Sequence, residues 1–164
     1  DRCYHCKNTL FRQILRAAEN DGFPVLLDGT NASDDAGDRP GMRALRELSV
    51  RSPLRECGLT KAEIRRLSRE AGLFTWDKPA YACLATRIRT GEEITLQKLK
   101  QTEKAEGFLF GLGFRDFRVR MVDNTAKLEL RETDLPLLLE NREKIVTELR
   151  KDYDSVLLNL EVRK

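Results

Sequence analysis

The chain has 164 residues, enough to bury one core or two small ones, so we expect one or two domains. Its 30 Lys and Arg residues nearly balance its 27 Asp and Glu residues and are spread along the sequence, which argues against a dedicated nucleic-acid-binding protein. No apolar run approaches the roughly 20 residues that cross a bilayer, so we expect a cytoplasmic protein without a membrane partner.

The first half of the chain alternates helical and strand-like segments. Apolar residues recur at helical spacing over residues 7–19, and Asn20-Asp21-Gly22 then predicts the end of a helix. The apolar run over residues 24–28 is typical of a buried parallel strand. The other elements expected here are a short helix over residues 42–48, a strand or extended segment over residues 50–54 that stops at Pro53, and a helix that begins with a Thr60–Glu63 capping box and ends at Gly72.

A polar loop, residues 29–41, follows the first predicted strand. Because ligands of open α/β sheets sit at the carboxyl ends of strands, this loop is a candidate site for a nucleotide and its Mg²⁺ ion, which prefers oxygen ligands. Asp and Asn also favour turns through local hydrogen bonds, and this simpler role stays open. The candidate nucleotide contacts are Asp28, Thr30 and Asn31, and the candidate Mg²⁺ ligands are Asp34, Asp35 and Asp38.

The second half follows a different pattern. Residues 74–90 show no clear period, and we place a domain boundary near residues 88–93, between domains 1–90 and 91–164. The sequence therefore predicts an α/β domain with a parallel sheet, followed by a small α+β domain. The later elements form an α-β-β-α-β module with a helix over residues 95–110, a strand over 117–120, a turn at Asp123-Asn124, a strand over 126–130, a helix over 135–150 and a strand over 156–162.

Cysteines in a cytoplasmic chain are more often metal ligands or redox groups than a disulfide framework. Cys3 and Cys6 form a Cys-x-x-Cys pair, which suits an iron–sulfur site, half of a zinc site or a dithiol redox pair. Cys83 has Lys78 before it and Arg87 after it, and nearby positive charge favours the reactive thiolate. A buried structural cysteine is the simpler alternative for Cys83.

Several short motifs, taken together, resemble one known family. They are Cys3-x-x-Cys6, Asp28-Gly29-Thr30-Asn31-Ala32, Arg39-Pro40-Gly41, Arg51-Ser52-Pro53-Leu54, Leu59-Thr60-Lys61-Ala62-Glu63-Ile64 and Pro79-x-x-x-Cys83-Leu84-Ala85-x-Arg87. The combination resembles the pyridinium biscarboxylate mononucleotide sulfurtransferases (LarE type) of the PP-loop ATP pyrophosphatase superfamily, over nearly the whole chain. The resemblance implies that the first domain is part of a PP-loop domain, which is Rossmann-like and of the adenine nucleotide alpha hydrolase type.

The family's phosphate-binding Ser-Gly-Gly-x-Asp-Ser loop precedes the first helix and is not in this sequence. We therefore expect that an N-terminal portion is missing and that this fragment is inactive alone.

The resemblance implies an ATP-dependent sulfur transferase. In this family ATP with Mg²⁺ adenylylates a carboxylate of a nicotinate-derived mononucleotide, and a sulfur nucleophile then displaces AMP, in the biosynthesis of the nickel-pincer cofactor. Some members give up the sulfur of a cysteine, whereas others hold a [4Fe-4S] cluster on three cysteines and pass on an extra sulfide. Cys3, Cys6 and Cys83 match the second type, with Cys83 as the catalytic, sulfur-handling residue.

The resemblance also implies a substrate clamp in the second domain. Arg118 and Arg120 point to the same face of a predicted strand, and two guanidinium groups suit a phosphate. From the residues alone, a solvated strand face with partners such as Glu129 stays open. The family's positions add Arg87 as a cofactor-binding residue and Glu106 and Glu129 as metal ligands, and the family forms trimer-based homo-oligomers.

Two other functions stay open. A tRNA thiolase or an amidotransferase shares the PP-loop domain, but no basic surface interleaved with aromatic residues predicts an RNA partner. A zinc-stabilised binding module without enzymatic activity is the other alternative.

Overall fold

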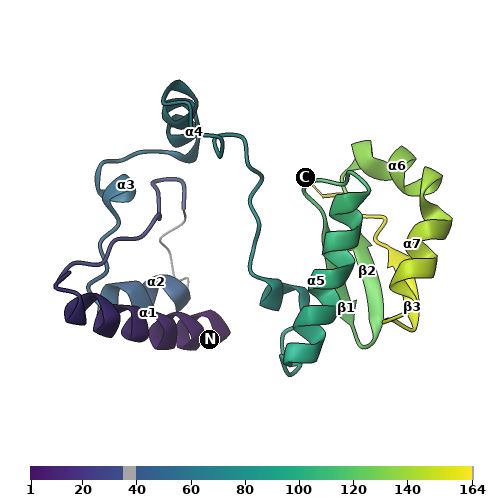
Figure 1. Cartoon of the computed structure of the whole chain (residues 1–164), viewed down its shortest axis with the longest axis horizontal. Coiled ribbons are helices and arrows are strands. Elements are labelled where there is room, and N and C mark those ends of the chain that lie inside the picture. The colour runs from purple at the N-terminus through teal and green to yellow at the C-terminus, as the bar shows by residue number, and fades with distance from the viewer. Residues whose placement is uncertain (35–39, 164) are drawn as a thin grey trace. The chain divides into compact units, whose positions relative to one another are not determined.

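The computed structural model describes residues 1–34 and 40–163. The chain is a mixed α/β protein that divides into two compact units, Asp1–Lys78 (unit 1) and Pro79–Lys164 (unit 2) (Figure 1). This division falls earlier in the chain than the boundary expected near residues 88–93. The reason is that Arg87 and Ile88 are buried in unit 2.

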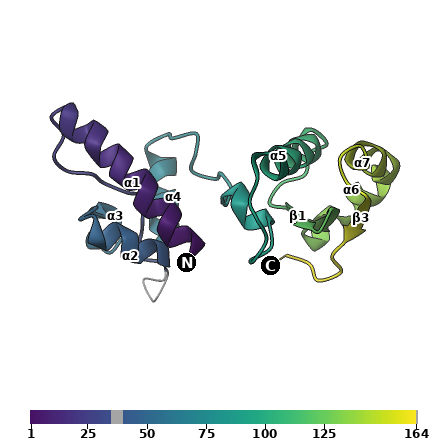
Figure 2. The same cartoon turned by 90° about the horizontal axis from the view of Figure 1, so that it is seen from below.

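The helices of unit 1 are α1 (Arg2–Asn20), α2 (Pro40–Glu47), α3 (Pro53–Glu56) and α4 (Lys61–Glu70). Helix α1 packs against α2, which buries Ala44 and Leu45 (Figure 2). Helix α1 begins earlier than the sequence predicted, so Cys3 and Cys6 lie on its first turns. Among all the helices that the structure describes, none is both long and apolar enough to span a membrane.

The predicted capping box at the start of α4 is confirmed. Thr60 N–H donates to Glu63 Oε2 at 2.8 Å, and Glu63 N–H donates to Thr60 Oγ1 at 3.3 Å. Two of the N–H groups that a helix start leaves without a helical partner are thereby satisfied. The helix ends before Gly72, whose φ of 69° lies in the left-handed region that glycine adopts without strain.

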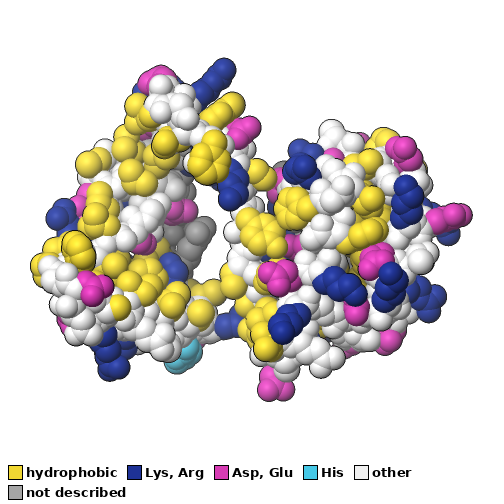
Figure 3. Space-filling view, in the orientation of Figure 1, with side chains coloured by type: hydrophobic (Ala, Val, Ile, Leu, Met, Phe, Trp, Pro, Cys, Tyr) yellow, Lys and Arg dark blue, Asp and Glu magenta, His cyan; other side chains and the backbone are white. Residues whose placement is uncertain are grey.

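The prediction of a buried strand over residues 24–28 is wrong. Leu27 makes a single parallel bridge to Arg51, and Val25 and Leu27 are each 56% exposed. A parallel strand is buried when the sheet continues and helices cover both faces, and no further strand joins this pair in the described part of unit 1. Pro53 begins α3 instead of ending a strand. Figure 3 shows hydrophobic side chains at the surface of unit 1.

Unit 2 confirms the predicted α-β-β-α-β order. Its sheet has the order β1-β2-β3, with β1 antiparallel to β2 and β3 parallel to β2. The single helix predicted over residues 135–150 is divided at Asn141, whose φ of −101° and ψ of 9° depart from helical values, and its side-chain amide donates to Leu137 O at 3.0 Å. The elements are the 3₁₀ turn η1 (Leu84–Arg87), α5 (Leu96–Gly111), β1 (Arg118–Val122), β2 (Thr125–Glu129), the 3₁₀ turn η2 (Glu132–Asp134), α6 (Leu135–Glu140), α7 (Arg142–Leu149) and β3 (Ser155–Leu158).

The core of unit 2 lies between its sheet and the helices α5 and α7. Strand β1 alternates as a half-buried strand should: Val119 and Met121 are buried, whereas Arg118 and Arg120 are only partly buried on the other face. The buried apolar cluster comprises Ala105, Leu109, Phe114, Phe117, Val119, Met121, Ala126, Leu128, Leu130, Leu138, Ile145, Leu149 and Tyr153. This core gives the arginine-bearing face of β1 a fixed support.

Candidate functional site

Cys83 lies at the surface of unit 2, on the turn that leads into η1. Thr86 fixes this turn, because its N–H and its hydroxyl both donate to the Cys83 carbonyl oxygen, at 2.9 and 2.7 Å. Ile88 N–H donates to Ala85 O at 3.3 Å. The thiol of Cys83 is therefore exposed while its backbone is held, which argues against a buried structural cysteine.

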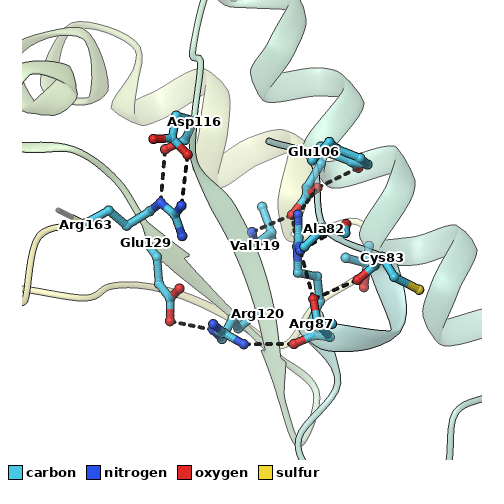
Figure 4. Close-up of polar contacts among 12 residues, drawn as sticks. Ala82, Cys83, Arg87, Glu106, Asp116, Val119, Arg120, Glu129 and Arg163 are labelled. Atoms are coloured by element: carbon cyan, nitrogen blue, oxygen red, sulfur yellow. Dashed lines mark hydrogen bonds and ion pairs between the residues drawn. The ribbon is translucent and has the colours of Figure 1, made fainter. Parts of the chain in front are cut away.

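The carboxylate of Glu106, on α5, accepts four hydrogen bonds. Arg87 donates from Nε to Oε1 at 2.6 Å and from Nη2 to Oε2 at 3.1 Å, and Val119 N–H donates to Oε1 at 3.0 Å (Figure 4). The Tyr81 hydroxyl donates to Oε2 at 2.7 Å. An ionised carboxylate offers about four lone-pair sites, so this one is fully used. Arg87 and Glu106 are 2% and 1% exposed, and each buried charge has its partner.

Tyr81 and Arg87 stand on either side of Cys83 and are fixed to the same carboxylate. Burial, the hydrogen bond to Glu106 and the charge of that carboxylate raise the pKa of Tyr81 to about 12, so the hydroxyl keeps its proton at neutral pH. Arg87 also donates from Nη1 to Thr86 Oγ1 at 3.0 Å. The resemblance implied a cofactor contact for Arg87 and a metal ligand at Glu106, whereas the structure places both in an internal ion pair.

Arg120 joins strand β1 to the Cys83 turn. Its Nε donates to Glu129 Oε1 at 2.6 Å, and its Nη1 donates to Thr86 O at 2.8 Å. Glu129 lies directly opposite Arg118 in the strand register, so Arg120 reaches it diagonally. The alternative that Glu129 is a cross-strand partner of these arginines therefore holds for Arg120. The resemblance implied a metal ligand at Glu129, whereas in the structure Glu129 binds Arg120.

Arg118 differs from Arg120 because its guanidinium makes no hydrogen bond or ion pair with any residue that the structure describes. Burial lowers the pKa of Arg118, and so do the positive charges of Arg163, Arg87 and Arg120, while Glu129 acts in the opposite direction. A guanidinium surrounded by like charges favours the approach of an anion. Of the two arginines predicted to clamp a phosphate, Arg118 is the one left available.

Arg163 is a charged residue of this region that the sequence analysis missed. It donates from Nε to Asp116 O at 3.1 Å and from Nη2 to Asp116 Oδ1 at 2.9 Å (Figure 4). These bonds tie the C-terminal segment to the start of β1. No local sequence signal points to Arg163, because its contacts with Asp116 depend on the fold. Tyr81 was also missed, although it stands two residues before Cys83 and its position in that motif was a signal.

In unit 1, the loop predicted to contact a nucleotide is held by its own side chains. Asp28 Oδ2 accepts from Thr30 Oγ1 at 2.6 Å, and Asp28 Oδ1 accepts from Ser52 Oγ at 2.6 Å. Burial alone raises the pKa of Asp28, but these hydrogen bonds and the charge of Lys7 hold it below its ordinary value. Asp28 thus remains an anion that shapes the loop.

The next residues of this loop also bind one another. Asn31 Oδ1 accepts from Ser33 N–H at 2.9 Å, and Asp34 Oδ2 accepts from Asn31 N–H at 3.0 Å. These are the local turn contacts that the sequence left open as the simpler role. Asp35 and Asp38, the other candidate Mg²⁺ ligands, lie outside the described residues.

One of the open grooves is lined by residues that the sequence predicted to bind a ligand, and another is not. A groove of about 540 Å³ in unit 1 is lined by Cys3 and Lys7 of α1 and by Asp28, Thr30 and Asp34 of the loop, together with residues 40–42. A larger groove of about 610 Å³ runs along α5 in unit 2, where it is lined by lysines and contains none of the predicted residues. The smaller groove is therefore the candidate place for a ligand in unit 1.

Cys3 and Cys6 are exposed free thiols three residues apart on α1, and this spacing places them on one side of a helix. They belong to unit 1, whereas Cys83 belongs to unit 2. Over residues 1–34 and 40–163, no group of three or more His, Cys, Asp or Glu side chains is arranged to hold a metal ion. The site that combines all three cysteines stays a prediction.

Comparisons with known proteins support a relationship with the sulfur-inserting synthases that the motifs resemble. No protein-family model matches the sequence. The chain is similar to pyridinium-3,5-bisthiocarboxylic acid mononucleotide synthase of Lactiplantibacillus plantarum, with 34% identity over 132 residues, which are 80% of this chain and 48% of that protein.

Two uncharacterized proteins are also similar to this chain. One, from Synechocystis sp., is 42% identical over 130 residues, or 79% of this chain and 48% of that protein. The other, from Methanocaldococcus jannaschii, is 34% identical over 164 residues, or 99% of this chain and 64% of that protein. The chain thus spans 48 to 64% of the length of these relatives.

Proposed function

We propose that this chain is part of an ATP-dependent sulfur transferase, in which Cys83 handles the sulfur that enters a carboxylate of a pyridinium mononucleotide. One observation carries the proposal: the exposed Cys83 stands on a turn that Arg120 joins to β1, where Arg118 has no internal partner among the described residues. A sulfur-bearing residue and an anion-attracting residue thus share one rigid part of unit 2. The similarity to the Lactiplantibacillus plantarum synthase supports the class of substrate.

The proposed reaction has two steps. A substrate carboxylate oxygen attacks the α-phosphate of ATP, so that an acyl adenylate forms and pyrophosphate leaves. A sulfur nucleophile then forms the C–S bond, and the C–O bond breaks as AMP leaves with its electron pair. The anionic sulfur is the effective nucleophile, and neighbouring cations favour the anion. Because the Ser-Gly-Gly-x-Asp-Ser motif is not in this sequence, we assign ATP activation to the whole protein that carries this chain.

In unit 1, we propose that the groove beside Asp28 and Thr30 receives part of the MgATP. Asp28 acts on the ligand indirectly, because its oxygens are occupied by Thr30 and Ser52 and fix the shape of the loop. Lys7, which lines the same groove, brings a positive charge suited to a phosphate.

The experiment that tests the function is an assay of the product. The whole protein is incubated without oxygen with MgATP, pyridinium-3,5-biscarboxylic acid mononucleotide and sulfide. Mass spectrometry should detect exchange of a carboxylate oxygen for sulfur, with AMP and pyrophosphate formed alongside. Formation of AMP without any C–S product, or sulfur transfer to tRNA instead, would contradict the proposal.

Arg118→Ala is expected to raise the KM for the mononucleotide roughly ten- to hundredfold with little change in kcat. A hydrogen bond between charged groups contributes about 1.5–3 kcal/mol, and Arg118 has no described partner to give up. Steady-state kinetics of thiocarboxylate formation measure both constants. Arg142→Ala removes an exposed arginine of α7 and serves as the control. An unchanged KM in Arg118→Ala would remove Arg118 from substrate binding.

The second part of the proposal is a [4Fe-4S] cluster on Cys3, Cys6 and Cys83. All three are exposed free thiols, so each is accessible to a cluster. A cluster held by three thiolates leaves one iron without a protein ligand, where an extra sulfide can bind.

Anaerobic reconstitution is expected to load about four iron atoms per chain in the wild type and in Cys57→Ser, which changes another exposed cysteine. Cys3→Ser and Cys6→Ser should each lose most of this iron, because a Cys-x-x-Cys pair supplies two of the three ligands. Iron and acid-labile sulfide analysis provides the measurement. Full iron loading in both variants, or zinc in place of iron in the wild type, would exclude the cluster.

A further inference from the structure

The residues on both sides of Cys83 converge on one carboxylate that belongs to a different element. Tyr81 and Arg87 bind Glu106 through three hydrogen bonds of 2.6 to 3.1 Å. Glu106 is itself fixed, because it lies on α5 beside buried Ala105 and also accepts from Val119 N–H of β1. The segment between Tyr81 and Arg87 is therefore closed into a loop whose two ends share one anchor.

Within this closed loop, Thr86 connects the anchor to Cys83. Arg87 Nη1 donates to Thr86 Oγ1, and the Thr86 hydroxyl donates to the Cys83 carbonyl oxygen. Arg120 holds the Thr86 carbonyl from the side of β1. The backbone of Cys83 is thus fixed relative to the strand that carries Arg118.

A buried ion pair is a poor means of stabilising a fold, because an apolar pair of similar volume is often as stabilising or more so. An apolar pair, however, lacks the directional hydrogen bonds that fix the orientation of two side chains. The forked guanidinium of Arg87 and the hydroxyl of Tyr81 meet fixed lone pairs, and such contacts set both distance and orientation. Reacting groups need this kind of precision, since small misplacements slow a reaction severely.

We propose that Glu106 is a positioning residue for the sulfur step: by holding Tyr81 and Arg87 it presents Cys83 at a fixed place relative to the anion position at Arg118. The inference rests on the proposed sulfur-handling function of Cys83. It replaces the metal-ligand role implied for Glu106 with a role that uses all of its acceptor sites.

Tyr81→Phe tests the proposal with little disturbance of the fold. It removes one hydrogen bond to Glu106 but keeps the ring that lies 6.1 Å from the Phe110 ring, and it leaves the Arg87–Glu106 pair in place. The amide of Thr86 should exchange its hydrogen about tenfold faster, because the turn loses one of the three hydrogen bonds that hold it to Glu106. The kcat for sulfur transfer should fall about tenfold while the KM for the mononucleotide stays the same, because Arg118 is untouched.

Tyr4→Phe is the matched control for hydrogen exchange. In unit 1, the Tyr4 hydroxyl donates to Glu47 Oε2 at 2.7 Å, the same distance as for Tyr81 and Glu106. Its loss should leave exchange at Thr86 unchanged.

Three outcomes separate this inference from the function on which it rests. Unchanged exchange at Thr86 in Tyr81→Phe would show that Glu106 does not hold the turn. Faster exchange with unchanged kcat would show that holding the turn does not serve the reaction. Full activity of Cys83→Ala would instead overturn the proposed function itself.

Discussion

Glu106→Ala is expected to destabilise unit 2 by about 3–5 kcal/mol, because Arg87 would keep a buried positive charge without its partner. Val119 N–H and the Tyr81 hydroxyl would lose their acceptor at the same time. Urea unfolding of the chain, followed by circular dichroism, measures the loss. The effect should be among the largest of any single substitution in this unit, since most cost far less.

An exposed pair of equal length provides the control. Arg66 Nη1 lies 2.6 Å from Glu70 Oε1, but these side chains are 62% and 58% exposed. Glu70→Ala should therefore change stability by no more than about 1 kcal/mol. The double substitution Arg87→Met with Glu106→Leu should recover much of the stability lost in Glu106→Ala, because it buries no unpaired charge. A loss of stability in Glu106→Ala no larger than that in Glu70→Ala would show that Arg87 does not keep a buried, unpaired charge.

The features that the sequence predicted correctly depend on local chemistry. The capping box of Thr60 and Glu63 needs only four consecutive residues, and the hairpin turn at Asp123-Asn124 needs only two. The order of elements in unit 2 was predicted from the spacing of apolar residues, which can be read within each segment without knowing the rest of the fold. Asn141 shows the limit of hydrophobic period, because the non-helical backbone angles of this one residue divide a helix that the period alone predicts as continuous.

The features that the sequence did not predict depend on contacts between distant segments. The resemblance implied a cofactor contact for Arg87 and a metal ligand at Glu106, and only the fold brings the two side chains together in a buried ion pair. The apolar run around Leu27 looks like a buried strand, but burial depends on neighbours that no single segment specifies. The strand register and the Cys83 turn give the guanidinium of Arg120 its partners, Glu129 and the Thr86 carbonyl oxygen. They leave the guanidinium of Arg118 available to an anion.

Cys83→Ala is expected to reduce sulfur transfer by roughly a thousandfold or more, because it removes the proposed cluster ligand that handles the transferred sulfur. The thiol is exposed, so the substitution should change the free energy of unfolding by less than about 0.5 kcal/mol. Loss of activity with unchanged stability would place the defect in the chemistry. Cys57→Ala, which changes an exposed cysteine of unit 1, should retain activity.

The most direct measurement is a single turnover of the whole protein without oxygen, in which thiocarboxylate and AMP are quantified together for the wild type, Cys57→Ala and Cys83→Ala. We predict that the wild type and Cys57→Ala form both products, and that Cys83→Ala forms no thiocarboxylate. Thiocarboxylate from Cys83→Ala in the same amount as from the wild type would contradict the assignment of Cys83 as the sulfur-handling residue.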